Sequence, residues 1–161
     1  MTQSAQSKGT PTGATAVRRD GCEIIVTRAF DSPARAVFAA WTQAEIFRLW
    51  WAPKSMGAVL SACEIDARTG GGYRITFGAG EESATFFGKY LEVTAPSRLV
   101  WTNEESDEAP VTTVTFEAQG GRTLLELRER YADEPPADAV EGMQAMSGEQ
   151  FSQLDEVLAS Q

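Results

Sequence analysis

The sequence predicts an α+β domain in which a curved antiparallel sheet of about seven strands wraps around a long C-terminal helix. Between residues 56 and 131, short segments with apolar residues at alternate positions are separated by glycine-rich turns. The last part of the chain instead repeats its apolar residues at three- and four-residue steps, as an amphipathic helix does. The apolar face of the sheet needs a cover, and only the final helix is long enough to provide it.

A first strand and two short helices are predicted before the rest of the sheet. The strand covers residues 23–30, where apolar and β-branched residues are frequent. Ser32 is expected to cap the first helix, and Pro33 suits its first turn. Thr42 and Glu45 have the spacing of a capping box, so a second short helix is expected to begin there.

Six further strands are predicted, and short turns join them into an antiparallel meander. After the triple glycine at 70–72, Tyr73 and Phe77 alternate with polar residues, which indicates a strand with one buried face. Gly88 is expected to mark a bulge that bends the longest strand. The six strands are expected at residues 56–66, 73–77, 83–94, 99–102, 111–118 and 123–131.

An amphipathic helix is predicted at the end of the chain. Asp133 can cap it, and Pro135-Pro136 fit its opening. Two glycines inside it each cost about 1 kcal/mol relative to alanine, so packing against the sheet must stabilise it. The face expected to pack consists of Val140, Met143, Ser147, Phe151, Leu154 and Leu158.

Composition limits the cellular setting and the partners. Residues 1–20 are predicted to form a disordered arm, because small and polar residues dominate there, and residues 21–161 to form one domain. The formal net charge of −9 argues against nucleic acid or a membrane surface as a partner. Because the arm has no apolar stretch typical of a secretory signal, we expect a cytoplasmic protein with two reduced cysteines.

The sequence contains no histidine, and this excludes several kinds of chemistry. Catalysis by Ser-His-Asp or Cys-His groups is ruled out, as are zinc or iron sites with histidine ligands. A general base would have to be Asp, Glu, Lys, Tyr or a thiolate. No calcium-binding loop of the DxDxDG type is present, so we expect neither a metal nor another cofactor.

Six segments, taken in their order and spacing, carry a resemblance to a known superfamily. They are VTRAFDSPARAVFAAWT (26–42), RLWWAP (48–53), TGGGYRIT (69–76), GKYLEVTAPSRLVWT (88–102), TTVTFEAQGGRTLLELRER (112–130) and QLDEVL (153–158). With them the chain resembles the START-like superfamily, also called SRPBCC, whose fold is the helix-grip or Bet v 1-like fold. Within it, the chain is similar to the branch of homologues of the activator of Hsp90 ATPase. The resemblance covers roughly residues 22–159.

One departure from the family pattern concerns the final helix. Members commonly carry Gly-Trp ahead of a Leu-Asp pair, whereas Glu149 and Gln150 stand ahead of Leu154-Asp155 in this chain. Either Phe151 supplies the missing aromatic surface, or the helix seats differently and the mouth of the cavity changes.

The resemblance implies a cavity between sheet and helix, in which relatives bind lipids, polyketides, aromatic hormones or drugs. We therefore expect a protein that binds a small hydrophobic or aromatic ligand rather than an enzyme. Two alternatives are a cyclase- or hydrolase-like enzyme that works without histidine and a stress-related protein that assists an Hsp90-type chaperone. Self-association into a homodimer is a further prediction for the sheet edge or the Trp51 region.

The ligand-binding candidates are aromatic residues and methionines expected on inner faces: Trp50, Trp51, Tyr73, Phe77, Phe86, Tyr90, Trp101, Phe116, Met143 and Met146. The alternative is that most of them simply fill the core. For Trp50 and Trp51 the two hypotheses are stacking on a ligand at the cavity mouth and wedging the short helices against the sheet.

No catalytic residue is assigned from the sequence. The groups considered are Arg74, Glu92, Glu117, Glu126, Arg128 and Tyr90. Strand alternation places Glu126 and Arg128 opposite Leu125 and Leu127, so they are expected to face solvent. Tyr90 is the best candidate for an inward polar group, because its hydroxyl could orient a ligand.

Overall fold

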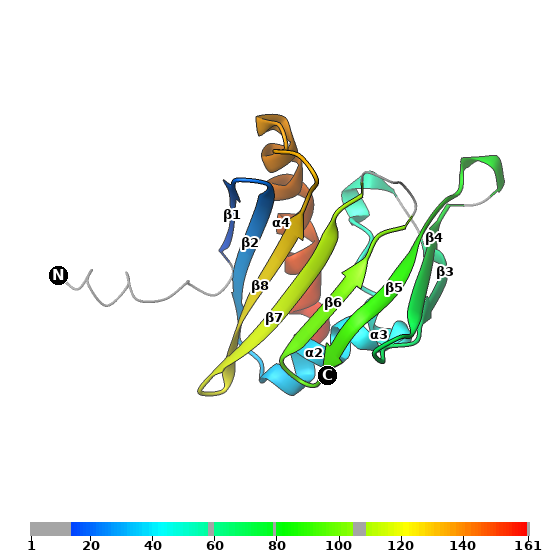
Figure 1. Cartoon of the computed structure of the whole chain (residues 1–161). Coiled ribbons are helices and arrows are strands. Elements are labelled where there is room, and N and C mark those ends of the chain that lie inside the picture. Colours follow the sequence, from blue (N-terminus) through cyan, green and yellow to red (C-terminus); the bar gives the residue numbers. More distant parts are fainter. Residues whose placement is uncertain (1–13, 58–59, 79, 105–108, 161) are drawn as a thin grey trace.

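The computed structural model describes residues 14–57, 60–78, 80–104 and 109–160, which form an α+β fold (Figure 1). The sheet has eight strands in the order β1-β2-β8-β7-β6-β5-β4-β3, and every neighbouring pair is antiparallel. The long helix α4 lies behind the β2, β8 and β7 side of the sheet in this view. The predicted fold class is confirmed, with one strand more than expected.

The strands are β1 (Thr15–Asp20), β2 (Glu23–Phe30), β3 (Leu60–Ile65), β4 (Gly72–Phe77), β5 (Ala84–Thr94), β6 (Arg98–Thr102), β7 (Val111–Gln119) and β8 (Arg122–Arg130). The helices are α2 (Ala34–Thr42), α3 (Ala44–Phe47) and α4 (Ala137–Ala159), with two 3₁₀ turns, η1 (Lys54–Met56) and η2 (Gly80–Glu82). No helix in the described residues combines the length and the apolar character needed to cross a membrane.

Strand β1 lies inside the segment predicted to be a disordered arm, so that prediction is wrong for Thr15–Asp20. The strand pairs with β2 along its whole length, and Gln144 of α4 donates a hydrogen bond to the Thr15 carbonyl (2.8 Å). Its sequence shows no apolar alternation because β1 gains its partners from the backbone groups on the edge of β2. Residues 1–13 of the predicted arm lie outside the described residues.

The predicted side-chain caps of the short helices are wrong. Helix α2 begins after Pro33 without a side-chain cap, and the Ser32 carbonyl instead accepts a hydrogen bond from the Thr123 hydroxyl (2.7 Å). The Thr42 hydroxyl donates to the Phe38 carbonyl in its own helix (2.9 Å), so it forms no capping box. A hydroxyl can bond forward or backward along the chain, and the packed position of the helix decides which.

Helix α4 and strand β5 also differ from the prediction in detail. Pro136, not Asp133, precedes the first turn of α4. The irregularity in β5 falls between Tyr90 and Glu92 rather than at Gly88. Gly88 lacks a side chain for another reason, since a Cβ there would lie 1.8 Å from the Thr102 carbonyl oxygen of β6.

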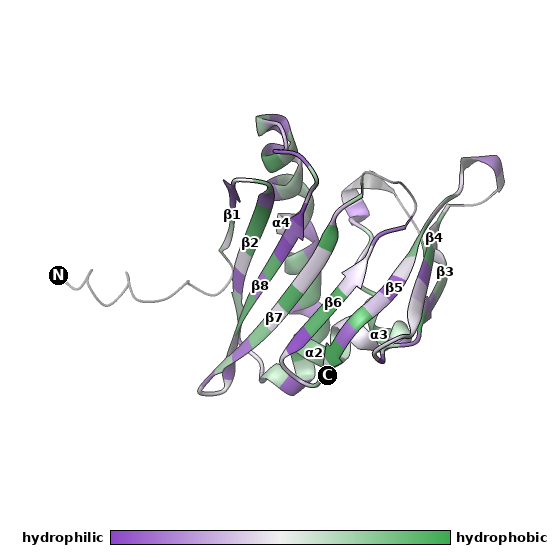
Figure 2. Cartoon of the chain, in the orientation of Figure 1, coloured by the Kyte–Doolittle hydropathy of each residue, from purple (hydrophilic) through white to green (hydrophobic). Residues whose placement is uncertain are grey.

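The core lies between the inner face of the sheet and the helices. Hydrophobic and hydrophilic residues alternate along the central strands (Figure 2), and the inward members are buried with α2 and α4. The core that strands and helices form together includes Val26, Phe30, Trp41, Leu99, Val114, Leu125, Phe151 and Leu154. Helix α4 contacts β1 and β2, whereas α3 contacts β3. Between these two covered ends, the inner face of the sheet opens onto a cavity.

Candidate functional site

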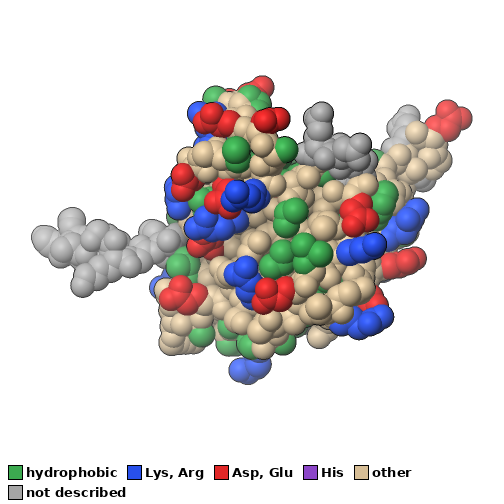
Figure 3. Space-filling view, viewed as in Figure 1, with side chains coloured by type: hydrophobic (Ala, Val, Ile, Leu, Met, Phe, Trp, Pro, Cys, Tyr) green, Lys and Arg blue, Asp and Glu red, His purple; other side chains and the backbone are tan. Residues whose placement is uncertain are grey.

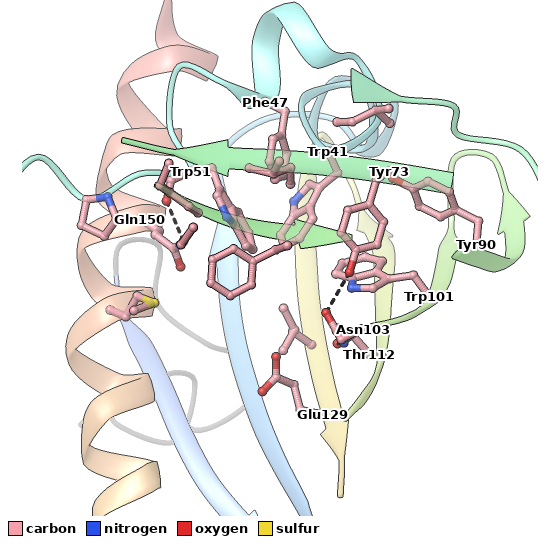
Figure 4. Close-up of a pocket in the computed structure, with 18 residues that line it drawn as sticks. Trp41, Phe47, Trp51, Tyr73, Tyr90, Trp101, Asn103, Thr112, Glu129 and Gln150 are labelled. Atoms are coloured by element: carbon pink, nitrogen blue, oxygen red, sulfur yellow. Dashed lines mark hydrogen bonds between the residues drawn. The ribbon is translucent and has the colours of Figure 1, made fainter. Parts of the chain in front are cut away.

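A cavity of about 420 Å³ lies between the inner face of the sheet, the short helices and α4 (Figure 4). Ligand sites in proteins typically enclose about 300–1,000 Å³ and are lined mainly by apolar side chains. Most of the lining is aromatic or aliphatic. These residues are Trp41, Phe47, Trp51, Pro53, Ile65, Tyr73, Ile75, Phe77, Ala84, Phe86, Tyr90, Trp101, Leu127 and Met146.

One row of side chains crosses the sheet and forms a continuous wall of the cavity. Tyr90 of β5 is paired with Trp101 of β6, Trp101 with Thr112 of β7, and Thr112 with Glu129 of β8. Directly paired residues on antiparallel strands point to the same face. All four side chains line the cavity, so strand register alone places this row on the inner face.

The β4–β5 hairpin supplies the wall nearest to solvent. Ile75 of β4 is paired with Phe86 of β5, and the Phe77 and Phe86 rings meet edge to face with centroids 5.6 Å apart. Phe86 is 41% exposed although it lines the cavity. Its ring therefore lies at the rim, where a bound molecule would cover it.

Aromatic rings from the short helices form the opposite wall. Phe47 of α3 stacks on Trp51 with centroids 4.7 Å apart, and the Trp41 ring of α2 lies 5.9 Å from that of Trp101. Figure 4 shows Phe47, Trp41 and Trp51 together at the upper end of the cavity. Their contacts hold large apolar surfaces in fixed positions around the empty space.

The structure separates the two adjacent tryptophans. Trp50 is fully buried, and its indole nitrogen donates to the Ala40 carbonyl (3.0 Å), so it wedges α2 in the core. Trp51 lines the cavity. Phe116 is also a core residue, and Met143 packs against the core, whereas Met146 lines the cavity and is 43% exposed. The other predicted candidates, Tyr73, Phe77, Phe86, Tyr90 and Trp101, also line it.

Two glutamines of α4 hold the tryptophan segment in place. The Gln150 amide donates to the Trp51 carbonyl (2.7 Å). The Gln153 amide donates to the carbonyls of Trp50 and Ala52 (both 2.9 Å). Gln150 stands at the position where family members commonly carry the tryptophan of the Gly-Trp pair, and it makes a polar contact in the wall of the cavity instead.

Phe151 supplies the aromatic surface on this part of α4. It is 1% exposed and meets Phe30 edge to face at 5.6 Å. Two residues before Phe151, Glu149 accepts hydrogen bonds from the hydroxyl and the backbone N–H of Ser55. These two hydrogen bonds lower the pKa of Glu149.

Polar groups gather at one end of the cavity. The Tyr73 hydroxyl donates to the Asn103 amide oxygen (2.9 Å), and the Asn103 amide nitrogen donates to the Thr112 hydroxyl (3.0 Å). Beside them on β8, Glu129 accepts a hydrogen bond from the Tyr131 hydroxyl (2.8 Å). This end combines a carboxylate with fixed neutral groups, next to an otherwise apolar wall.

Glu129 is a site residue that the sequence analysis missed, although a signal was present. Leu125 and Leu127 identify the inner face of β8, and Glu129 continues the same alternation. Burial raises the pKa of Tyr131, as do the charge of Glu129 and the hydrogen bond to it. Burial likewise raises the pKa of Tyr90, so its phenol stays protonated in the wall.

The other charged candidates do not line the cavity. Arg128 bonds to Glu126 (2.6 Å) and to Glu23 (2.8 Å). Glu92 pairs with Arg98 at 3.1 Å. The outer face of the sheet carries such positive and negative side chains intermixed (Figure 3). Among the residues that the structure describes, no group of three or more Cys, Asp or Glu residues could hold a metal ion.

Solved structures of several bacterial proteins share this fold. A crystal structure of a protein from Rhodobacter sphaeroides superimposes with a TM-score of 0.81 at 20% identity, covering 91% of this chain and 99% of that one. A solution structure of a protein from Staphylococcus epidermidis superimposes with a TM-score of 0.78 at 23% identity, covering 90% of this chain and 94% of that one. The solution structure of an AHSA1-like protein from Aeromonas hydrophila has a TM-score of 0.66 at 20% identity, covering 82% of this chain and 92% of that one.

Family membership follows from the sequence comparison. A search of curated proteins finds no match to this chain. The family model of activator of Hsp90 ATPase homolog 1-like proteins matches residues 31–159. That range begins directly after β2 and contains both short helices, strands β3 to β8 and α4. It agrees with the resemblance seen in the sequence. The chain therefore belongs to the family of activator of Hsp90 ATPase homolog 1-like proteins.

Proposed function

We propose that this protein binds a small, mainly apolar or aromatic molecule in the cavity between the sheet and α4. The observation that carries the proposal is a cavity of about 420 Å³ with an aromatic lining. Protein interiors are close-packed, and voids much larger than a water molecule are few. Leaving apolar surface unburied costs about 25 cal/mol per Å², so an open aromatic cavity is best explained by a ligand that fills it.

The rim of the cavity supports the same proposal. Phe86 of β5 and Met146 of α4 both line it, yet both residues remain more than 40% exposed. A ligand in contact with both would cover this apolar surface. The unbranched methionine side chain adapts to ligands of different shape, which suits a binding protein that accepts a class of molecules.

A ligand screen tests the proposal. Purified protein is heated with fatty acids, flavonoids and polyketides, and hits are titrated by tryptophan fluorescence. A ligand that binds only the folded state stabilises it by mass action and so raises Tm. At a free ligand concentration of a hundred times Kd, the free energy of unfolding increases by about 2.7 kcal/mol. Because Trp41, Trp51 and Trp101 line the cavity, the same ligand should change their emission. A library that changes neither Tm nor emission would contradict the proposal.

Catalysis in the same cavity is a second candidate, and one observation favours it. An enzyme without histidine needs another inward acid or base, for which a carboxylate or a phenol can serve, and both Glu129 and Tyr90 line the cavity. The test is to incubate each bound molecule with the protein and to search for a changed mass. Ligands recovered unchanged would remove this candidate and leave binding intact.

The family takes its name from an activator of Hsp90 ATPase, and that role stays a prediction for this chain. It requires a surface that contacts the chaperone rather than an open cavity. The measurement is the ATPase rate of a purified Hsp90 with and without the protein. An unchanged rate would remove this role.

A further inference from the structure

Glu129 is the one charged side chain among the described residues that line the cavity. It stands on β8 in register with Thr112 of β7, and both point to the inner face. Figure 4 shows Glu129 near Asn103 and Thr112, at the end of the cavity away from Phe47 and Trp41. The cavity is therefore asymmetric, with aromatic rings at one end and a carboxylate at the other.

Hydrogen bonds leave the polar end rich in acceptors. Asn103 uses both amide hydrogens, on the Thr112 hydroxyl oxygen (3.0 Å) and on the Pro110 carbonyl (2.6 Å). Its amide oxygen already accepts from Tyr73 (2.9 Å). The charged group at this end is the carboxylate of Glu129, which in its ionised form only accepts hydrogen bonds and has room for several donors on its two oxygens. A hydrogen-bond donor on a bound molecule would complement this carboxylate.

The surroundings favour a positive charge on that molecule. The Tyr131 hydroxyl donates to Glu129 (2.8 Å), and such a bond stabilises the ionised carboxylate. The Trp101 ring stands in the same row across the sheet as Thr112 and Glu129, and indole faces attract cations. The chain as a whole carries a formal charge of −9, which draws cations toward it. An anion in the cavity would meet Glu129 across an apolar medium, where repulsion is strong.

We propose that the ligand of this cavity is a lipophilic amine, whose protonated nitrogen binds Glu129 and whose apolar body packs among the aromatic rings. This inference rests on the proposed binding function and names the class of its ligand. Glu129 determines selectivity for the head group, while Trp51, Phe86 and the other rings supply affinity for the body.

Matched probes test the inference. Naphthalen-2-ylmethylamine, naphthalen-2-ylmethanol and naphthalene-2-carboxylate share one body, and dodecylamine, dodecanol and dodecanoate share another. Their Kd values are measured by isothermal titration calorimetry at pH 7, below the critical micelle concentration. We expect the amine of each series to bind about tenfold or more tightly than the alcohol, as for one charge-assisted hydrogen bond. The carboxylate is expected to bind most weakly.

Two variants identify the group responsible. Glu129→Gln keeps the size and an acceptor oxygen for Tyr131 but removes the charge, and it should abolish the preference for the amine. Glu126→Gln removes the same charge from β8 on the opposite face, where Glu126 bonds to Arg128, and it should keep the preference. Circular dichroism and Tm establish that both variants are folded.

The outcomes separate this inference from the function on which it rests. If alcohols or carboxylates bind as tightly as amines, or if Glu129→Gln keeps the preference, the lipophilic-amine assignment is wrong and the binding function stands. If no probe of either series binds, the binding function itself is contradicted. An equal loss of preference in Glu126→Gln would show a general charge effect and would also overturn the role of Glu129.

Discussion

The guanidinium of Arg28, on strand β2, donates a hydrogen bond to the Asp155 carboxylate of helix α4. Arg28 is 1% exposed, and its guanidinium carbon lies 4.8 Å from the centroid of the Phe30 ring. Its Nε and Nη1 atoms are buried, and no hydrogen-bond partner for them is present among the described residues. The Asp155 carboxylate therefore balances the buried positive charge of Arg28, and the pair joins the C-terminal part of α4 to the sheet.

Replacing Asp155 by asparagine should destabilise the fold. Removing one partner of a buried ion pair leaves the other charge uncompensated, and we expect the free energy of unfolding to fall by about 2–4 kcal/mol. Urea denaturation measures the change. The control is Glu156→Gln, which removes an exposed contact with Lys54 at 4.0 Å and should cost about 0–1 kcal/mol. Equal losses in the two variants would refute the role of the Arg28–Asp155 pair.

Phe86 and Phe87 form a matched pair for the ligand site. They are adjacent on β5 and similarly exposed, at 41% and 36%, but only Phe86 lines the cavity. For a ligand found in the screen, Phe86→Ala should raise Kd about 5- to 20-fold through lost aromatic contact, equivalent to roughly 1–2 kcal/mol. Phe87→Ala should leave Kd unchanged. Fluorescence titration decides, and weaker binding in both variants to the same degree would argue against this cavity.

Gln153 is predicted to contribute far more to stability than another glutamine of α4. Its side chain is 6% exposed and serves the carbonyls of Trp50 and Ala52 and the backbone N–H of Lys54. Gln153→Ala should cost about 2–4 kcal/mol, because several backbone groups lose their partner. Gln144→Ala removes one exposed bond, to the Thr15 carbonyl, and should cost about 1 kcal/mol or less. Thermal and urea unfolding compare the two variants, and similar losses of stability would contradict the role of Gln153 in holding the tryptophan segment.

Stability should fall at alkaline pH. The pKa values of Tyr90 and Tyr131 are raised above the ordinary value of 10.0, mainly by burial. Above pH 10 the unfolded chain loses these phenolic protons while the folded chain keeps them, so the unfolded state is favoured as pH rises. The stabilisation is complete below that pH. Urea unfolding between pH 8 and 11 measures the fall, and Tyr131→Phe should make it shallower. An unchanged slope in this variant would count against the burial of that phenol.

The fold could be predicted because its main elements have local signatures. Leu125 and Leu127 alternate in β8, and Phe151 and Leu154 follow the helical repeat in α4, so each element reveals its buried face. Strand β1 has no such signature, since Arg18, Arg19 and Asp20 dominate it. Its place depends on the free edge of β2, which exists only once the sheet has formed.

The sequence predicted a cavity lined by aromatic residues, but it could not predict which of these residues line it. Trp50 and Trp51 are chemically identical neighbours, yet one is fully buried and the other lines the cavity. Their separation depends on the Ala40 carbonyl, which receives the Trp50 indole N–H, and on the Gln150 contact. Such contacts join residues far apart in the chain, so no local pattern encodes them.

By itself, the sequence determined the α+β class, the alternation of strand faces and the absence of histidine chemistry, because these depend on local periodicity and on composition. Only the tertiary structure decided that the space between sheet and α4 stays open and that Glu129 lies in its wall. The reason is that a cavity depends on how far α4 lies from β4 and β5. The position of α4 in turn depends on the Arg28–Asp155 pair, which joins it to β2, and on the Gln153 hydrogen bonds, which join it to the Trp50–Ala52 segment. These contacts form only when parts of the chain that are far apart in sequence have come together.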